Sequence, residues 1–296
     1  MSSIAATAQE DDVLQLQQLD EHVYAVVGPF GNRSAENLGN NATFGFVVTG
    51  EGVVVIDAGG SYKGAAAIDA QIRKVTDKPV KAVINTGGQD HRWLGNSFFK
   101  ERGAQIIASE ATVTDHRQRL QDQMFALGNL VGNEGMAGTE AVYADKLFSE
   151  RTSFTLGGTT FELIHAGPAH TPGDTLVWLP KERIVFSGDI VYTGRMLGVM
   201  PYSNSRHWIE AFNTMAALEP EQIVPGHGPV ITLERARSDT LDYLTFLRNA
   251  VGSFMDEGGS ITEIGSIDQS PFSYLVDYEI LKGRNAQQVY QEMEWE

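Results

Sequence analysis

The sequence contains no cysteine among its 296 residues. This absence excludes a disulfide framework, a thiolate zinc site and a cysteine nucleophile. Positive charge is also scarce, because 22 lysine and arginine residues stand against 38 aspartate and glutamate residues and give a formal net charge of −16. Such a balance argues against a nucleic-acid partner, which requires a basic surface.

Long apolar runs are missing as well. No stretch approaches the roughly 18 apolar residues of a membrane-spanning helix. We therefore expect no membrane partner and a small-molecule substrate instead. Apolar residues make up 42% of the chain and charged residues 20%, which is usual for a globular protein. No linker divides the sequence, so one domain is predicted over residues 13–296, while the oligomeric state stays open.

The first twelve residues are polar, and we expect them to form a flexible tail. They include Ala6-Thr7-Ala8, which resembles the small-residue cleavage region of a secretory signal without the basic and apolar parts that would precede it. This pattern favours a periplasmic or secreted protein, with a cytoplasmic protein as the alternative.

Alternating strand and helix patterns in the first half predict a layered α/β domain. Strands are expected between Leu14 and Val27 and between Phe44 and Asp57, and two segments rich in glycine and asparagine, Gly28–Asn41 and Gly128–Gly138, are expected to be loops that border a site. Further elements are predicted as helices over 63–75, 96–102 and 110–125 and as strands over 80–85 and 105–108. His116 falls within the last of these helices, in a segment that reads as solvent-exposed.

The second half of the chain shows the same two patterns. Strands are predicted near 152–156, 159–165, 175–179, 183–187 and 222–224, and amphipathic segments over 233–256 and 273–294. A helix over 206–218 has Trp208, Phe212 and Met215 on one face, with Ser205 as its expected N-cap.

Three polar residues each follow an apolar strand inside a turn rich in glycine or proline. They are His170, Asp189 and His227. Turns at strand ends are where α/β folds place ligand-binding groups. Two histidines and a carboxylate form a set of ligands that zinc, iron or manganese accept.

Four motifs, in order and at consistent spacing, resemble those of the metallo-β-lactamase superfamily over roughly residues 20–230. They are Ile56-Asp57-Ala58-Gly59, Gly167-Pro168-Ala169-His170-Thr171-Pro172-Gly173-Asp174-Thr175, Phe186-Ser187-Gly188-Asp189 and Val224-Pro225-Gly226-His227-Gly228. The resemblance implies an αββα sandwich, in which two β-sheets are flanked by helices and the site lies at the sheet edge. It also implies that His170 serves a first metal, that Asp189 bridges two metals and that His227 serves the second.

The His-x-His-x-Asp-His signature of that superfamily is degraded in this chain. Aligned without gaps between Asn85 and Asn96, its two leading histidines are replaced by Gly87 and Gln89, its aspartate by His91 and its last histidine by Arg92. A complete first metal site is therefore not expected. A shift of one residue would instead place Asp90 and His91 at the Asp-His positions.

The surviving residues predict a mononuclear site. His91, Asp189 and His227 are expected to hold one divalent ion, zinc first and iron or manganese as alternatives, with His170 as a fourth ligand or a neighbour. Asp189 or Asp90 would orient or deprotonate a water molecule. The expected activity is metal-dependent hydrolysis of an ester, thioester or lactam. Two alternatives are a metal-free pseudoenzyme that binds a small molecule and an iron-dependent redox enzyme.

Arg92 complicates the metal prediction. A guanidinium about 4 Å from a dication costs roughly 8 kcal/mol at an effective dielectric constant near 20. The sequence is compatible with three placements of this side chain. Arg92 points away from the ion, or it contacts the substrate as part of the catalytic machinery, or it replaces the missing cation by pairing with Asp189.

Overall fold

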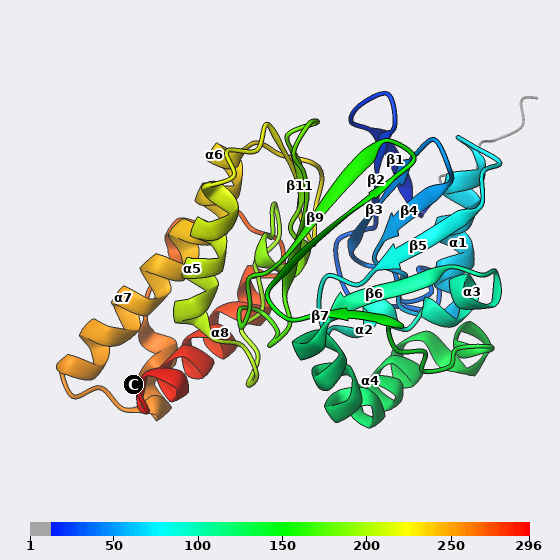
Figure 1. The fold of residues 1–296 in the computed structure, drawn as a ribbon. Coiled ribbons are helices and arrows are strands. Elements are labelled where there is room, and N and C mark those ends of the chain that lie inside the picture. The colour runs from blue at the N-terminus through cyan, green and yellow to red at the C-terminus, as the bar shows by residue number, and fades with distance from the viewer. Residues whose placement is uncertain (1–12) are drawn as a thin grey trace, which may run out of the picture.

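The computed structural model describes residues 13–296, so the predicted tail over residues 1–12 lies outside the described residues. Two β-sheets pack face to face, and helices cover the outer face of each sheet (Figure 1). The fold is the αββα sandwich that the resemblance implied.

The first sheet has seven strands in the order β1-β2-β3-β4-β5-β6-β7. Its strands are β1 (Gln15–Gln18), β2 (Val23–Val27), β3 (Thr43–Val48), β4 (Val53–Ile56), β5 (Val80–Ile84), β6 (Gln105–Ser109) and β7 (Lys146–Phe148). The second sheet has five strands in the order β12-β11-β10-β9-β8. They are β8 (Arg151–Leu156), β9 (Thr159–His165), β10 (Thr175–Leu179), β11 (Ile184–Phe186) and β12 (Gln222–Val224).

The helices divide between the two outer faces (Figure 1). On the side of the first sheet lie α1 (Tyr62–Arg73), α2 (Asp90–Trp93), α3 (Asn96–Glu101) and α4 (Glu110–Met136). On the side of the second lie η1 (Gly188–Ile190), α5 (Ser205–Ala216), α6 (Leu233–Ala236), the π turn η2 (Arg237–Leu241), α7 (Asp242–Asp256), η3 (Ile261–Ser266), η4 (Ser270–Phe272) and α8 (Tyr278–Met293). Within residues 13–296, no helix combines the length and apolar character needed to cross a bilayer.

Strand β4 shows why an uninterrupted β-branched run forms a central strand. Val53 and Val55 point toward the helices of the first layer, whereas Val54 and Ile56 point into the core between the sheets. Both faces are covered, so each side chain of the run is buried. Between the sheets, a Cβ at Gly45 would overlap the ring of Phe186, and glycine therefore permits the close approach.

Strand directions bring the predicted site residues to one edge. Strands β4, β5 and β6 run parallel in the first sheet, and β11 and β12 run parallel in the second. The carboxyl ends of parallel strands lie at the same edge of a sheet, where α/β folds bind ligands. The segments that follow β5, β11 and β12 carry His91, Asp189 and His227.

Two local predictions are wrong. The segment Gly128–Gly138 is not a loop, because α4 continues to Met136 with an interruption at Gly132, whose φ is +78°. Leu127 and Val131, one turn apart, are buried against Trp93 and Leu94. This tertiary packing keeps the segment helical despite its glycines.

The N-cap of α5 is also displaced by one residue. Asn204, and not Ser205, caps the helix, because its side-chain oxygen accepts a hydrogen bond from the backbone N–H of His207. The Ser205 N–H instead donates to the carboxylate of Glu292 on α8, a partner that is remote in the sequence.

Candidate metal centre

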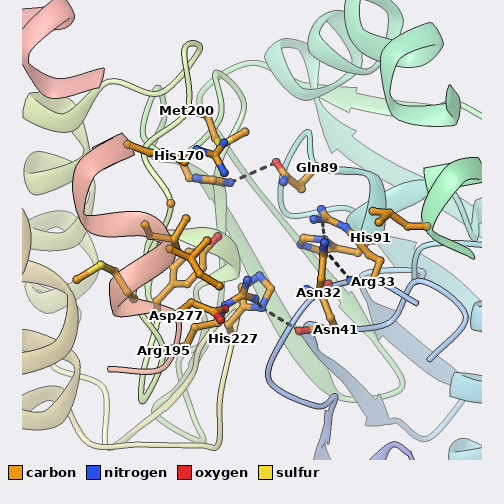
Figure 2. A pocket seen from close by; sticks show the side chains of 17 residues that line it. Asn32, Arg33, Asn41, Gln89, His91, His170, Arg195, Met200, His227 and Asp277 are labelled. Carbon is orange, nitrogen blue, oxygen red and sulfur yellow. Dashed lines mark hydrogen bonds and ion pairs between the residues drawn. The ribbon is translucent and has the colours of Figure 1, made fainter. Parts of the chain in front are cut away.

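A cavity of about 480 Å³ lies where the loops at the sheet edge meet α8 (Figure 2). Its size is in the range of small-molecule sites in proteins. Three of the predicted ligands, His91, His170 and His227, line it, whereas Asp189 is fully buried at its base. The expected convergence of these residues at one edge is thus present in the structure.

Three of the four predicted ligands form a tight group. Ligand atoms of His91, Asp189 and His227 all lie within 4.8 Å of one another. Asp189 Oδ2 is 3.4 Å from His91 Nε2, and Asp189 Oδ1 is 3.3 Å from His227 Nε2. Atoms that bind one zinc ion tetrahedrally at about 2.0–2.2 Å stand roughly 3.3 Å apart. The group therefore fits a single divalent ion.

The hydrogen bonds of His227 determine which of its nitrogens is free. Nδ1 lies 2.9 Å from the carbonyl oxygen of Asn41, which only accepts, so Nδ1 carries the hydrogen. Burial holds the pKa of the ring well below its usual value, although Asp189 opposes this effect. The neutral ring consequently presents the lone pair of Nε2 to the Asp189 carboxylate.

His91 has an unsatisfied nitrogen at the same place. Its Nε2 is buried and has no hydrogen-bond partner among the described residues. An unpaired buried polar atom costs about 1–3 kcal/mol, and a bound cation would remove that cost in the tautomer whose hydrogen lies on Nδ1. Nε2 of His91 and the lone pair of His227 Nε2 both face the carboxylate of Asp189.

The structure corrects the fourth predicted ligand. His170 lines the cavity but lies outside the three-residue group. Its Nε2 is 3.2 Å from Oε1 of Gln89 (Figure 2). That oxygen also accepts a hydrogen bond from the Tyr202 hydroxyl. Gln89 stands where the superfamily has a histidine, and it is the hydrogen-bond partner of His170 Nε2. Burial lowers the pKa of His170 to about 4, so the ring is neutral near pH 7.

Arg92 takes the third of its three possible placements. Its Nη2 donates to Asp189 Oδ1 at 2.7 Å and its Nη1 to Asp57 Oδ2 at 2.9 Å. Its remaining donors reach Asp189 Oδ2 and the carbonyl oxygens of Thr43 and Gly226. The side chain is fully buried and does not line the cavity. The expectation that Arg92 contacts a substrate is therefore wrong, and its contacts identify it as a support for Asp189.

The two carboxylates that share Arg92 differ electrostatically. For Asp189, burial would raise the pKa, but Arg92, which donates to both carboxylate oxygens, holds it well below its usual value. For Asp57, burial raises the pKa and is only partly offset by Arg92 and by two hydrogen bonds from Thr86. Asp189 is thus the firmly ionised partner and the stronger anionic ligand.

Gly87, which stands at a histidine position of the first metal site of the superfamily, lies close to Asp174, and Gly88 lies close to α4. A Cβ at Gly87 would lie 2.7 Å from a carboxylate oxygen of Asp174, and a Cβ at Gly88 would overlap Asp115 on α4. The Gly88 carbonyl accepts a hydrogen bond from Gln123, also on α4, at 2.6 Å. A histidine at position 87 would therefore require the Asp174 side chain to move.

The position of Asp90 does not suit the predicted role of acting on a water molecule in the site. It does not line the cavity, and its carboxylate accepts hydrogen bonds from Arg33 and from the backbone N–H of His91. It lies on the Nδ1 side of His91, 3.2 Å from that nitrogen, whereas Asp189 lies on the Nε2 side. The prediction that Asp90 deprotonates a water molecule is corrected by this placement, since it can only orient His91.

Several residues of the cavity were missed in the sequence. The loop Gly28–Asn41, expected to border a site, contributes Asn32, Arg33 and Asn41 to the wall. Arg195 and residues of α8 had no motif to indicate them; α8 contributes Ile280, Leu281 and Arg284. Their position results from the packing of the C-terminal helix, which no local pattern encodes.

His116, predicted to be solvent-exposed, is completely buried. Its ring stacks on Trp93 with centroids 4.1 Å apart, and Nε2 lies 3.1 Å from the carbonyl oxygen of Gly87. The helix α4 turns this face toward the motif loop, which the helical pattern alone did not reveal. Burial lowers the pKa of His116 to about 3, with Arg119 adding to the effect and the Gly87 carbonyl opposing it.

This burial predicts an acid sensitivity of the fold. As the pH falls below about 6.5, the unfolded chain binds a proton at His116, whereas the folded chain stays neutral down to about pH 3. The stability due to this group is therefore lost from about pH 6.5 downward, by about 2 kcal/mol at pH 5. His116→Phe keeps the stacking on Trp93. At pH 7.5 its free energy of unfolding should be about 1 kcal/mol lower than that of the wild type. Between pH 7.5 and pH 5, however, the variant should lose about 2 kcal/mol less of this free energy than the wild type loses.

Urea unfolding at several pH values measures this difference. His207→Gln, at a side chain of α5 that is 36% exposed, is the control, and its profile should run parallel to that of the wild type. Equal acid losses for His116→Phe and the wild type would contradict the prediction.

Fold and site together define an αββα protein with a candidate metal centre at the sheet edge. The family model of the Metallo-beta-lactamase superfamily matches residues 39–227, which include His91, Asp189 and His227. The chain belongs to this superfamily. Its members typically bind divalent metals, usually zinc. Helix α8 lies beyond the matched residues.

Curated relatives of the chain are enzymes. It is 30% identical over 151 residues to the 2,4-dinitroanisole O-demethylase subunit alpha of Nocardioides sp. (strain JS1661). The matched region covers 51% of this chain and 41% of that protein. It is 24% identical over 231 residues to the metallo-beta-lactamase type 2 of Elizabethkingia meningoseptica, covering 77% and 84%. The chain therefore spans about two fifths of the first relative and most of the second.

Solved structures agree with the fold. A metallo-beta-lactamase from Pontibacter korlensis superposes with a TM-score of 0.63 at 22% identity, over 78% of this chain and 99% of that one. A stereoselective inverting sec-alkylsulfatase from Pseudomonas sp. superposes with a TM-score of 0.71 at 17% identity, over 94% and 50%. Identities this low show a shared architecture and leave the substrate undetermined.

Proposed function

We propose that the protein is a metal-dependent hydrolase with one divalent ion, zinc first, held by His91, Asp189 and His227. The observation that carries the proposal is the lone pair of His227 Nε2, which faces an ionised carboxylate oxygen at 3.3 Å. Two electron-rich atoms at this distance repel each other unless a cation or a proton lies between them. With Nδ1 donating to the Asn41 carbonyl, the neutral ring has no hydrogen on Nε2, and this supports a metal ion between the two atoms.

Arg92 divides its hydrogen bonds among several acceptors. Its guanidinium is shared between Asp57 and Asp189 and also donates to the carbonyl oxygens of Thr43 and Gly226. Each carboxylate oxygen has more than one lone pair. Asp189 can therefore accept the hydrogen bonds of Arg92 and still serve as a ligand on its other side.

A divalent ion supplies a water molecule of lowered pKa and polarises a carbonyl group. The chain contributes orientation and proton placement. Arg92 keeps Asp189 ionised, and the Asn41 carbonyl fixes the tautomer of His227. His170 donates from Nε2 to Gln89, and its Nδ1 is buried without a partner among the described residues.

The walls of the cavity suit a small substrate with an anionic and an apolar part. Arg195 and Arg284 line it, and among the described contacts only Arg195 has an acidic partner, Asp277. Apolar side chains cover the remaining wall, among them Met196, Met200, Ile280 and Leu281. An ester, thioester or lactam that carries a carboxylate matches this combination.

Metal content is the decisive measurement. Protein purified without added metal and dialysed against a weak chelator should retain one equivalent of a divalent ion by elemental analysis, and it should hydrolyse some anionic esters, thioesters or lactams of a substrate panel. Two retained equivalents would contradict the mononuclear site. Iron as the retained metal would favour a redox enzyme instead of a hydrolase.

The second candidate function is binding of a small molecule without catalysis. The observation in its favour is the engagement of both Asp189 oxygens by Arg92. In this case the protein would retain no ion, even after incubation with excess zinc, but would still bind anionic ligands in the cavity. Elemental analysis after reconstitution separates the two functions.

A further inference from the structure

The loop that carries Arg33 contacts His91 at the nitrogen opposite to the proposed metal. Nη2 of Arg33 lies 2.9 Å from His91 Nδ1 (Figure 2). It also lies 2.5 Å from Asp90 Oδ1, and Nε of Arg33 lies 3.0 Å from the same carboxylate oxygen. The two hydrogens of Nη2 can serve these two acceptors at once. A guanidinium only donates hydrogen bonds, so Nδ1 of His91 must be the acceptor.

This contact fixes the tautomer of His91. With Nδ1 accepting, the single ring hydrogen of the neutral imidazole lies on Nε2, the atom that faces Asp189 at 3.4 Å. A nitrogen that carries a hydrogen has no lone pair in the ring plane for a metal. While Arg33 is bound to Nδ1, His91 is therefore unable to serve as a ligand.

An alternative partner for Nδ1 is already in place. Asp90 Oδ1 lies 3.2 Å from Nδ1. If Arg33 leaves, Nδ1 can carry the hydrogen and donate it to Asp90. Nε2 then presents its lone pair toward Asp189, in the carboxylate–histidine–metal arrangement that orients metal-binding imidazoles.

We propose that Arg33 is a positioning residue that selects the tautomer of His91 and so competes with the metal ion for this ligand. This inference rests on the proposed metal site and adds a regulatory element to it. Arg33 lies on the loop that lines the cavity, and its side chain is 16% exposed. Release of Arg33 from Nδ1 of His91 therefore favours metal binding at Nε2, and metal binding at Nε2 favours this release.

The chain provides a matched control on the other histidine. Nη1 of Arg195 lies 3.3 Å from His227 Nδ1, and Arg195 is paired with Asp277 as Arg33 is paired with Asp90. His227 Nδ1, however, already donates to the Asn41 carbonyl, so removal of Arg195 leaves its tautomer unchanged. Arg33→Met and Arg195→Met each remove one positive charge from the same cavity, but only the first changes a tautomer.

Two readouts test the proposal. Long-range ¹H–¹⁵N correlation spectra of the metal-free wild type should show the ring hydrogen of His91 on Nε2. The same spectra of Arg33→Met should show it on Nδ1. The His91→Gln variant assigns the signal. Competition with a chromogenic chelator should show Zn²⁺ bound at least tenfold more tightly by Arg33→Met than by the wild type. For Arg195→Met the gain should be about threefold or less.

The outcomes separate this inference from the proposed function. A hydrogen on Nδ1 of His91 in the metal-free wild type would overturn the proposed role of Arg33. Equal gains in zinc affinity for Arg33→Met and Arg195→Met would also overturn it, because a purely electrostatic effect would produce such equal gains. A tautomer change without zinc uptake by any of the proteins would support the control of His91 by Arg33 and overturn the metal-dependent hydrolase.

Discussion

Replacement of Arg92 by methionine is expected to lower the free energy of unfolding by about 3–5 kcal/mol, because it leaves buried carboxylates without their cation. Arg92 donates to Asp57, to Asp189 and to two backbone carbonyls, and all of these acceptors lose a partner in the variant. Urea unfolding of metal-free protein at pH 7.5 measures the loss. If the variant is too unstable to purify, Arg92→Lys, which keeps the charge but not the paired geometry, should show a smaller loss.

The control for this prediction is an arginine in a more exposed ion pair. Arg73 pairs with Asp69 one turn earlier on α1, and the two side chains are 35% and 21% exposed. Arg73→Met should cost less than about 1 kcal/mol, as is usual for such pairs. Comparable losses in the two variants would show that Arg92 does not carry the buried network.

Replacement of Asp189 by asparagine is expected to abolish metal retention and hydrolysis together. The substitution removes the anionic ligand of the proposed site while it keeps the size of the side chain. Loss of a residue that only supports a ligand costs 10- to 100-fold in metal affinity, so loss of the ligand itself should cost at least about 100-fold. Chelator competition measures the affinity, and turnover of any substrate found in the panel should fall to background.

Asp277→Asn is the matched control for metal binding. Asp277 also lines the cavity and is paired with an arginine, but it lies outside the three-residue ligand group. Its zinc affinity should stay within about threefold of the wild type, since the charge it removes is partly screened. Unchanged zinc affinity in Asp189→Asn would exclude this group as the metal site, and unchanged turnover would exclude it as the seat of the chemistry.

The placement of Arg92 and Arg33 gives the two sides of the site different properties. Arg92 is fully buried, uses its donors on fixed acceptors and stabilises the ionised form of Asp189. Arg33 is partly exposed on a loop and makes its bonds to Asp90 and to a nitrogen of His91. We therefore expect substitutions of Arg92 to act mainly on stability and substitutions of Arg33 mainly on metal affinity.

The positions of most strands along the chain were predictable from the sequence, and the resemblance to the superfamily implied that the site lies at the sheet edge. Continuous β-branched runs such as Val53–Ile56 are buried on both faces wherever they occur, and turns rich in glycine and proline follow them. His91, Asp189 and His227 each follow such a strand, and parallel strands bring their carboxyl ends to one edge. Local patterns therefore indicated a layered α/β domain and the residues of the candidate site, whereas the αββα sandwich was implied by the resemblance to the superfamily.

Only the tertiary structure decided how the polar side chains pair. The sequence left three placements for Arg92, and the burial of Asp57 and Asp189 around it selects one. His170 is drawn to Gln89, 81 residues away, and His116 is buried because α4 packs against the motif loop. Hydrogen-bond partners and burial are set by contacts between distant segments, which depend on how layers and helices pack. Residue spacing along the chain specifies the elements, but it does not specify those contacts.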